Sequence, residues 1–377
     1  MGEVMFVLGG QRILVPFPFL QTSPDELQRF LFLFLNPIQF MSDRYRRQRA
    51  FRQVGEAGQK RLSESRIAIC GMGALGAMVS ERLCRMGIGS LRLIDRDWVE
   101  LDNLPRQALY TTQDALELRP KAIASQSHLL AINPDITLEA VVEDITFENA
   151  EQWLTGFDCI VDGTDNFETR YLINEVAWKH KIPWVHAGIV GASGQAMTFF
   201  PGKTACFRCL LPDVPPIEQM QTCDSAGVLG AAVGVIASWQ AMDVVKAILQ
   251  PDTADSQLRV FDLWEGSVRK LRLPTASQCR VCQKGQYDFL TGSAGALARV
   301  LCGRGAVQIQ SKGRDAIRLE DLAVRLRLEG DVQMNPYLLR FSKPPHSVSV
   351  FADGRAIIHG TESPDEARKI YTRWIGG

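Results

Sequence analysis

Two groups of residues in this sequence have types and spacings that could do chemistry, and the first is a glycine-rich turn. Gly71, Gly73 and Gly76 follow an apolar, strand-like run at 66–70, and Asp95 ends the next such run. In a nucleotide-binding βαβ unit the first glycine permits a tight turn, the second lets a phosphate approach the backbone, and the third lets helix and strand pack closely. Free N–H groups at the helix start then face the anion. This order predicts a nucleotide site in which Asp95, 19 residues past Gly76, is the ribose acceptor.

Polar and charged residues crowd the sequence just after Asp95. They are Asp97, Asn103, Arg106 and Gln107. An NAD-dependent oxidoreductase needs one acid for the ribose and then a site for hydride transfer. A second acid, two amides and an arginine suit the charge of a triphosphate better. The crowding therefore favours ATP, with an NAD-dependent oxidoreductase on the same glycine turn as the alternative.

One lysine and two carboxylates extend this candidate site. Lys121 lies just inside a predicted helix start, an unfavourable end for a cation unless an anion also binds there; the alternative is an ordinary surface lysine. The strand-like run 157–161 leads into Asp162 and Asp165, at the strand end where α/β sheets place ligands. Because a triphosphate needs Mg²⁺, which takes one or two carboxylates, we predict Asp165 as the magnesium ligand and Asp162 as a weaker second. Alternatively, Asp165 only caps the helix 167–180.

The second group consists of four cysteines in two C-x-x-C pairs. Cys206 and Cys209 form one pair, and Cys279 and Cys282 form the other. Four thiolates suit tetrahedral Zn²⁺, and a closed all-thiolate site is structural because it leaves no coordination position for catalysis. Cys223 lies outside the pairs, ahead of an apolar helical segment, where a thiol can have a lowered pKa. It is a candidate nucleophile.

The run 95–107 resembles the adenylating enzymes of the ubiquitin-activating (E1-like) superfamily. It is most similar to the bacterial ThiF, MoeB and HesA type, which activates sulfur-carrier proteins for thiamine or molybdopterin synthesis. The resemblance extends from about Ser42 to Cys282 and includes an R-Y-x-R-Q motif at 44–48 and a G-T-D-N motif at 163–166. It implies a Rossmann-like adenylation domain that uses ATP, Mg²⁺ and a structural zinc.

The resemblance also implies roles for individual residues. In this family the second arginine of the R-Y-x-R-Q motif, here Arg47, reaches into the partner subunit's ATP site, which implies a homodimer with shared active sites. Arg106 and Lys121 are implied to contact ATP phosphate, and Asp165 to hold Mg²⁺. Relatives carry a cysteine at the position of Cys223 that either bonds to the carrier's activated tail or is not needed, and both readings stay open.

The implied reaction is adenylation of a small ubiquitin-like sulfur carrier that ends in Gly-Gly. The carrier's terminal carboxylate attacks the α-phosphorus of ATP and pyrophosphate leaves, which gives an acyl-adenylate. A sulfur donor such as a cysteine desulfurase is the expected further partner. The sequence leaves open whether the carrier serves thiamine or molybdopterin synthesis, with a slight preference for thiamine. A non-catalytic nucleotide-binding scaffold is the non-enzymatic alternative, although it would leave Arg47, Arg106, Lys121 and Asp165 without a function.

Composition excludes several other classes of protein. The 377 residues include 42 basic and 42 acidic side chains, so the zero net charge gives no reason to expect nucleic acid or an anionic membrane as a partner. No apolar run approaches the roughly 18 to 20 residues that span a bilayer. Nine cysteines, four of them in C-x-x-C pairs, favour metal or thiol chemistry in a reducing cytoplasm over a disulfide framework.

The length and element pattern predict an α/β chain with three parts. Residues 1–41 form an N-terminal extension whose apolar runs are interrupted by prolines; it has no signal-peptide pattern, and translation starting at Met41 is the alternative. Residues 42–284 form the ATP-binding domain, with a mixed, mostly parallel sheet. Residues 285–377 form a small α/β domain of unknown role, with a hairpin turn at 352–355 and a final helix at 363–374.

Overall fold

The computed structural model describes residues 3–8, 11–16, 44–215, 223–252, 257–293, 300–301, 306–309, 317–352, 354–361 and 363–376. These residues fall into two compact units, Met1–Gln59 and Lys60–Gly377. In the first unit, strands β1 (Glu3–Leu8) and β2 (Gln11–Pro16) pair as an antiparallel hairpin, which the sequence analysis did not predict. The unit also contains helix α3 (Arg46–Arg49) and the start of α4 (Gly55–Glu64).

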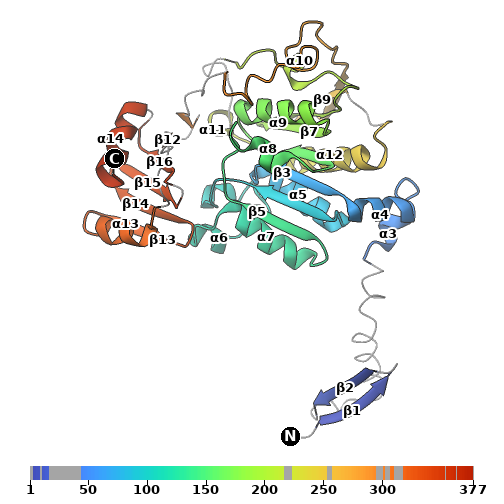
Figure 1. Cartoon of the computed structure of the whole chain (residues 1–377), viewed down its shortest axis with the longest axis horizontal. Coiled ribbons are helices and arrows are strands. Elements are labelled where there is room, and N and C mark those ends of the chain that lie inside the picture. The colour runs from blue at the N-terminus through green and yellow to red at the C-terminus, as the bar shows by residue number, and fades with distance from the viewer. Residues whose placement is uncertain are drawn as a thin grey trace. The chain divides into compact units, whose positions relative to one another are not determined.

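An eight-stranded sheet forms the centre of the second unit (Figure 1), in the order β10-β9-β8-β7-β6-β3-β4-β5. Its strands are β3 (Arg66–Cys70), β4 (Ser90–Ile94), β5 (Thr137–Val141), β6 (Cys159–Asp162), β7 (Trp184–Val190), β8 (Ser193–Phe199), β9 (Leu258–Asp262) and β10 (Ser267–Leu271). The pairings from β5 to β7 are parallel, and those from β7 to β10 are antiparallel. The predicted mixed, mostly parallel sheet is confirmed.

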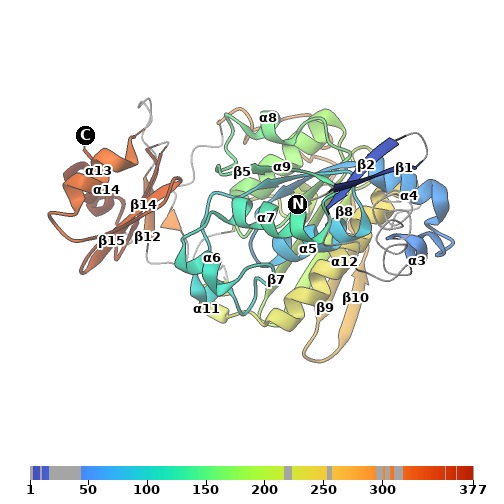
Figure 2. The ribbon, with the colours of Figure 1, turned by 90° about the horizontal axis from the view of Figure 1, so that it is seen from below.

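Helices cover both faces of this sheet, as Figures 1 and 2 show. On one face, α12 (Gly230–Leu249) packs against α5 (Ala74–Met86), which packs against α7 (Lys121–Ile132). On the other face, α9 (Phe167–His180) packs against α8 (Ala150–Leu154) and α10 (Phe207–Leu210). The connections contain the shorter helices η2 (Leu101–Asn103), α6 (Thr112–Leu116) and α11 (Cys223–Ala226).

The local sequence explains why these elements begin and end where they do. Strands β3 and β6 are almost entirely buried, as expected for central parallel strands covered by helices on both faces. Helix α5 follows Gly73 and ends at Gly87, whose φ of 77° is in the left-handed region that favours glycine at a helix C-terminus. The glycine-rich turn is therefore held between a buried strand and a well-terminated helix.

Helix α12 corrects one sequence-based expectation. It is 20 residues long, with a mean hydropathy of 1.4 in its most apolar window, so the expectation that no apolar run reaches membrane-spanning length is wrong. However, 61% of that window is buried inside the protein, and the helix packs against β7 and β8 as well as α5. Its apolar residues therefore serve the core of the sheet.

A second sheet of six antiparallel strands, called here the C-terminal sheet, has the order β11-β12-β16-β15-β14-β13. Its strands are β11 (Val300–Leu301), β12 (Ala306–Ile309), β13 (Asp331–Met334), β14 (Leu338–Lys343), β15 (His346–Phe351) and β16 (Ala356–His359). Helices α13 (Leu319–Leu326) and α14 (Pro364–Trp374) share an apolar core with it. Ser363 caps α14 by accepting the Glu366 N–H, which agrees with the predicted final helix.

Candidate functional site

The three glycines of the turn have the geometry that their spacing predicts. Gly71 has a φ of +84°, which favours glycine, and an added Cβ there would lie 2.7 Å from the Gly163 carbonyl oxygen. At Gly76 an added Cβ would lie 1.8 Å from the Gly71 carbonyl oxygen, so the helix can approach the strand end only because no side chain intervenes. At Gly73 no atom of the described residues lies within 4 Å of such an atom. This position is therefore open to a ligand's approach.

Asp95 ties the glycine turn to the loop that follows β4. Its two carboxylate oxygens accept the backbone N–H groups of Met72 at 2.6 Å and of Asp97 at 2.7 Å. Burial and the neighbouring Asp97 raise the pKa of Asp95, while Lys121 opposes this shift. Asp95 thus fixes the shape of the turn, and its carboxylate lies at the edge predicted for the ribose.

Lys121 lies against the same loop. It is the first residue of α7 and is only 3% exposed. Its Nζ is 3.5 Å from an Asp97 carboxylate oxygen, and its backbone N–H donates to the Asp97 carbonyl at 2.8 Å. The surface-lysine alternative is therefore wrong, because this cation is buried beside a helix N-terminus and an acid.

Arg96, which the sequence analysis missed, lies between the two acids of this loop. Its guanidinium pairs with Asp144 at 2.8 Å and lies 3.7 Å from the Asp97 carboxylate. Burial alone would lower the pKa of Arg96, but Asp144, Asp97 and Asp165 outweigh it and raise that pKa. The influence of Asp165 brings this acid into the electrostatic environment of the loop. The only sequence signal for Arg96 was its position between Asp95 and Asp97.

The 3₁₀ segment η2 presents the next group of predicted residues. The Asn103 carbonyl accepts the N–H groups of Arg106 and Gln107, at 3.1 and 2.9 Å. Asn103 and Gln107 are buried, and among the described residues Asn103 Oδ1 and Gln107 Oε1 have no hydrogen-bond partner. Arg106 is half-buried, and its Nη1 donates to the Asp102 carbonyl. Buried acceptors without partners are expected where a polar ligand supplies the missing donors.

Tyr110 connects this segment to the glycine turn. Its hydroxyl donates to the Met72 carbonyl and lies 3.0 Å from the Ser125 hydroxyl in α7. Burial and Asp95 raise the pKa of Tyr110, so it stays a neutral donor. The glycine turn, the η2 segment and α7 are therefore connected through one buried phenol.

Asp165 and Asp162 have different environments, and the structure corrects the helix-cap alternative for Asp165 and the metal assignment of Asp162. Helix α9 is capped by Asn166, which accepts the Thr169 N–H at 2.8 Å, and not by Asp165. The side chain of Asp165 is exposed. Asp162 is fully buried; one oxygen accepts from Thr164, and the other lies 2.7 Å from His186 Nδ1. The prediction of Asp162 as a second magnesium ligand is therefore wrong, since its oxygens already have protein partners.

Arg170, also missed from the sequence, completes this buried network. Its Nε lies 3.1 Å from Asp162, and its Nη2 donates to the Thr164 carbonyl at 2.7 Å. His186 is fully buried, which lowers its pKa against the opposing effect of Asp162. The network holds the backbone that immediately precedes Asp165.

The donor set around the turn fits ATP with magnesium. Open space at Gly73, free N–H groups at the start of α5, the buried Lys121 cation and the orphan acceptors in η2 match a triphosphate nucleotide. The exposed carboxylate of Asp165 leaves an oxygen ligand of the kind Mg²⁺ prefers. Arg47 is an exposed residue of α3 in the N-terminal unit, and the side chain of Cys223 lies outside the described side chains.

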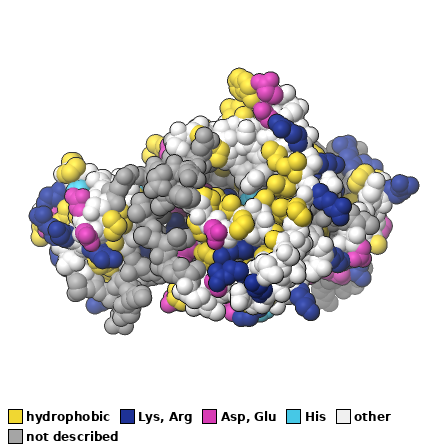
Figure 3. Space-filling model, turned by 90° about the horizontal axis from the view of Figure 1, so that it is seen from above, with side chains coloured by type: hydrophobic (Ala, Val, Ile, Leu, Met, Phe, Trp, Pro, Cys, Tyr) yellow, Lys and Arg dark blue, Asp and Glu magenta, His cyan; other side chains and the backbone are white. Residues whose placement is uncertain are grey.

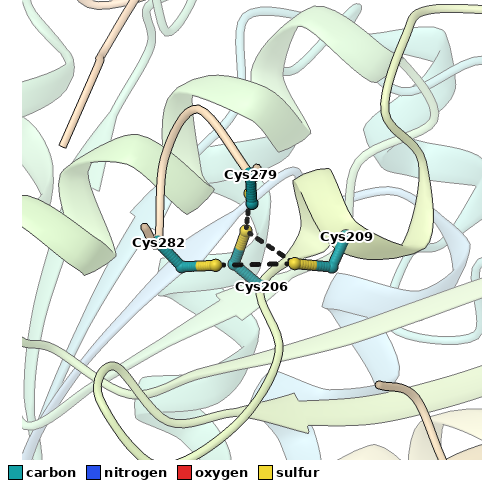
Figure 4. A group of neighbouring side chains, drawn as sticks. All are labelled: Cys206, Cys209, Cys279 and Cys282. Carbon is teal, nitrogen blue, oxygen red and sulfur yellow. Dashed lines mark hydrogen bonds between the residues drawn. The ribbon is translucent and has the colours of Figure 1, made fainter. Parts of the chain in front are cut away.

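The four cysteines of the C-x-x-C pairs converge as predicted (Figure 4). Their sulfur atoms all lie within 4.8 Å of one another, with Cys206 Sγ 3.4 Å from Cys279 Sγ and Cys209 Sγ 3.5 Å from Cys282 Sγ. A tetrahedral zinc with Zn–S bonds of about 2.3 Å separates its sulfurs by about 3.8 Å. The four thiols therefore fit a closed zinc site that joins the start of α10 to residues 279–282.

Charge on the surface is mixed in sign. On the face shown in Figure 3, basic and acidic side chains are interspersed, with hydrophobic side chains between them. The chain as a whole has no net charge, so attraction of an anionic ligand rests on local groups such as Lys121 and Arg106.

Comparison with known proteins shows the family to which this chain belongs. Residues 45–281 match the model of the ThiF family, which is more than half of the chain. The chain belongs to the ThiF family. Among its relatives, "Sulfur carrier protein ThiS adenylyltransferase" of Bacillus subtilis (strain 168) is 41% identical over 339 residues, which is 89% of this chain and 100% of the relative.

Other relatives match about two thirds of the chain. "Sulfur carrier protein adenylyltransferase" of Thermus thermophilus is 38% identical over 64% of this chain and 90% of its own length. "Sulfur carrier protein ThiS adenylyltransferase" of Escherichia coli (strain K12) is 38% identical over 67% of this chain and 99% of its own length. A crystal structure of E. coli MccB with ATP is similar in fold, with a TM-score of 0.53 and 24% identity over 59% of this chain and 68% of that chain.

Proposed function

We propose that this protein is an ATP-dependent adenylyltransferase that activates the C-terminal glycine of a small sulfur-carrier protein. The observation that carries the proposal is the buried Lys121 cation beside Asp97, at the end of the strand that follows an open glycine turn. The names of its ThiF-family relatives supply the substrate class, and three of them are sulfur-carrier adenylyltransferases.

The reaction requires positioning and charge neutralisation rather than a general base. The carrier's carboxylate is ionised at neutral pH and attacks the α-phosphorus of ATP, so the α–β phosphoanhydride bond breaks and pyrophosphate leaves. Lys121 and Arg106 offset the negative charge of the phosphates, Asp95 accepts from the ribose, and Asn103 and Gln107 hold polar groups of the nucleotide. Asp165 would hold Mg²⁺, which supplies further charge neutralisation when it is bound.

The remaining assignments concern the cysteines, the oligomeric state and the sulfur donor. Zinc held by Cys206, Cys209, Cys279 and Cys282 has a structural role. The enzyme works as a homodimer in the cytoplasm, and Arg47 of each subunit completes the ATP site of the other. Cys223 either bonds covalently to the activated carrier or is not needed, and a cysteine desulfurase or similar protein supplies sulfur to the adenylated carrier.

Carrier-dependent ATP–pyrophosphate exchange tests the proposal. We expect exchange with a carrier that ends in Gly-Gly and none with the same carrier lacking its last glycine. Separate thiamine-type and molybdopterin-type carriers would identify the pathway. A titration monitored by nicotinamide fluorescence tests the oxidoreductase alternative, which predicts NADH binding and no exchange. ATP binding without exchange on any carrier would instead favour a nucleotide-binding scaffold.

A further inference from the structure

The C-terminal sheet contacts the two backbone segments that carry Asp97 and Lys121. The first contact comes from Arg355, the last residue before β16 in the turn that joins β15 to β16, which is only 2% exposed. Its Nη2 donates to the Arg96 carbonyl at 3.0 Å, and its guanidinium lies 3.6 Å from the ring centre of Phe351. A buried arginine of the C-terminal sheet is thus bonded directly to the backbone between Asp95 and Asp97.

The second contact is made by Asn335, in the connection between β13 and β14. Its Nδ2 donates to the carbonyls of Glu117, at 3.0 Å, and Leu118, at 2.8 Å. Its Oδ1 accepts the N–H groups of Tyr337 and Leu338, which fixes the orientation of the amide. A cavity of about 610 Å³ lies between residues 116–120 and 333–337. Asn335 therefore holds the segment that immediately precedes Lys121.

An apolar cluster joins these two contacts. Trp98 and Leu118 are buried together with residues of the C-terminal sheet, and the Trp98 ring centre lies 5.7 Å from that of Phe351. Trp98 also pairs with Pro120 through an isolated antiparallel β-bridge. The cluster consists of Trp98, Leu118, Ala306, Leu338, Phe351 and Ile357. The loop after β4 and the start of α7 are thus held against each other and against one shared surface.

Leu118 has a backbone conformation that needs such support. Its φ is 50°, in the left-handed region that a leucine rarely adopts. Residues in such conformations persist when their surroundings over-determine them. The Asn335 bond to the Leu118 carbonyl and the burial of the Leu118 side chain supply that constraint, three residues before Lys121.

We propose that Arg355 and Asn335 are positioning residues for ATP, so that the C-terminal sheet completes the nucleotide site without touching the nucleotide. The proposal deepens the function proposed above and rests on it. Arg355 holds Asp97 in place through its hydrogen bond to the Arg96 carbonyl. Asn335 holds Lys121 in place through its hydrogen bonds to the carbonyls of residues 117 and 118. Because a pre-ordered loop loses less conformational entropy when ligand binds, release of either tie weakens ATP binding. The chemical step is little changed, since neither side chain meets the reacting atoms.

The test compares Arg355→Ala with a matched control in the same part of the chain. Arg325 also donates to backbone carbonyls, those of Trp374 and Ile375, but both bonds lie within the C-terminal sheet and its helices. For each full-length variant, calorimetry with Mg²⁺ and a non-hydrolysable ATP analogue gives Kd, and carrier-dependent exchange gives KM for ATP and kcat. We expect Arg355→Ala to raise Kd and KM about tenfold with kcat changed less than about twofold, and Arg325→Ala to leave all three near wild type.

Two further variants keep the test decisive. Arg355→Lys retains a donor for the Arg96 carbonyl and should recover part of the lost affinity, and Asn335→Ala should raise Kd by itself even if Arg355→Ala does not fold. Equal Kd values for Arg355→Ala, Asn335→Ala and Arg325→Ala would overturn the positioning role. The proposed function is tested separately. If the wild-type protein binds the ATP analogue but shows no exchange with any carrier, the adenylation assignment is wrong. The comparison of Kd values still tests the positioning role in that case.

Discussion

Substitution of Gly76 by alanine provides the sharpest test of how the glycine turn is built. The new methyl carbon would lie 1.8 Å from the Gly71 carbonyl oxygen and 2.9 Å from its carbon, so the backbone would have to retreat by more than an ångström. Alanine is favoured over glycine inside a helix by about 1 kcal/mol. Overpacking against rigid backbone costs about 3 kcal/mol. The cost of the clash exceeds the gain in helix propensity, and we expect Gly76→Ala to lower the free energy of unfolding by about 2 kcal/mol.

The matched control is Gly73→Ala, three residues earlier. In the part of the chain that the structure describes, no atom lies within 4 Å of the added methyl group. The free energy of unfolding should therefore fall by less than about 1 kcal/mol, the cost of alanine at a helix N-cap. The methyl would instead occupy the space through which a phosphate approaches the backbone, and we expect ATP affinity to fall about tenfold.

Urea unfolding followed by circular dichroism measures stability for both variants, and calorimetry with Mg²⁺ and an ATP analogue measures affinity. A Gly76→Ala protein as stable as wild type would refute the claim that helix α5 and the turn approach too closely for any side chain. A Gly73→Ala protein with wild-type affinity would refute the phosphate path.

Three further predictions address other parts of the molecule. Asp165→Asn removes an exposed carboxylate that does not cap a helix, so carrier-dependent exchange should fall about 100-fold while stability is unchanged. The control Glu148→Gln, at another exposed residue, should leave exchange intact. Full exchange in Asp165→Asn would remove Asp165 from the site. Cys279→Ser should lower the bound zinc measured by atomic emission from about one ion per chain to near zero and lower the melting temperature; a variant that retains zinc would contradict the four-thiolate site. Burial raises the pKa of Glu175 to about 7 from the usual 4.5, against N–H bonds from Leu290 and Phe289, so the folded state binds the proton more tightly. The contribution of Glu175 to folding stability is complete below pH 4.5 and is lost as pH rises through 7. Glu175→Gln should therefore make the free energy of unfolding in urea less dependent on pH over this range. The same pH dependence in both proteins would contradict the raised pKa of Glu175.

Local sequence patterns predicted most helices and strands because turns, caps and apolar spacing are encoded by residues close together in the chain. The glycine spacing placed the turn between β3 and α5, and the alternation of strands and helices predicted the parallel part of the sheet. The predicted hairpin around 352–355 and the final helix at 363–374 match the antiparallel pair β15–β16 and α14. Strand β13 was missed because it has only four residues, most of them exposed, so its polar–apolar alternation is too short to stand out.

The site was predicted less completely, because the wrong assignments concern residues whose partners are distant in sequence. Asp162 follows a strand as a metal ligand would, but its partner His186 is 24 residues further along the chain and belongs to β7. The tie between Arg355 and Arg96 spans 259 residues, so no motif could indicate it. Residue types placed the chemistry at the correct strand ends, but only the folded chain shows which carboxylates are already engaged.

The outer strand β10 bears on how this protein behaves at high concentration. All five of its residues are exposed, and among the strands the structure describes it pairs with β9 alone. An open strand border of this kind is a template for association between molecules, which proteins commonly suppress with charge. Arg269 and Lys270 lie within β10, and Trp264 in the turn between β9 and β10 is also exposed. Because salt screens such charges, self-association should increase in concentrated salt, and storage in dilute buffer should favour the dispersed protein.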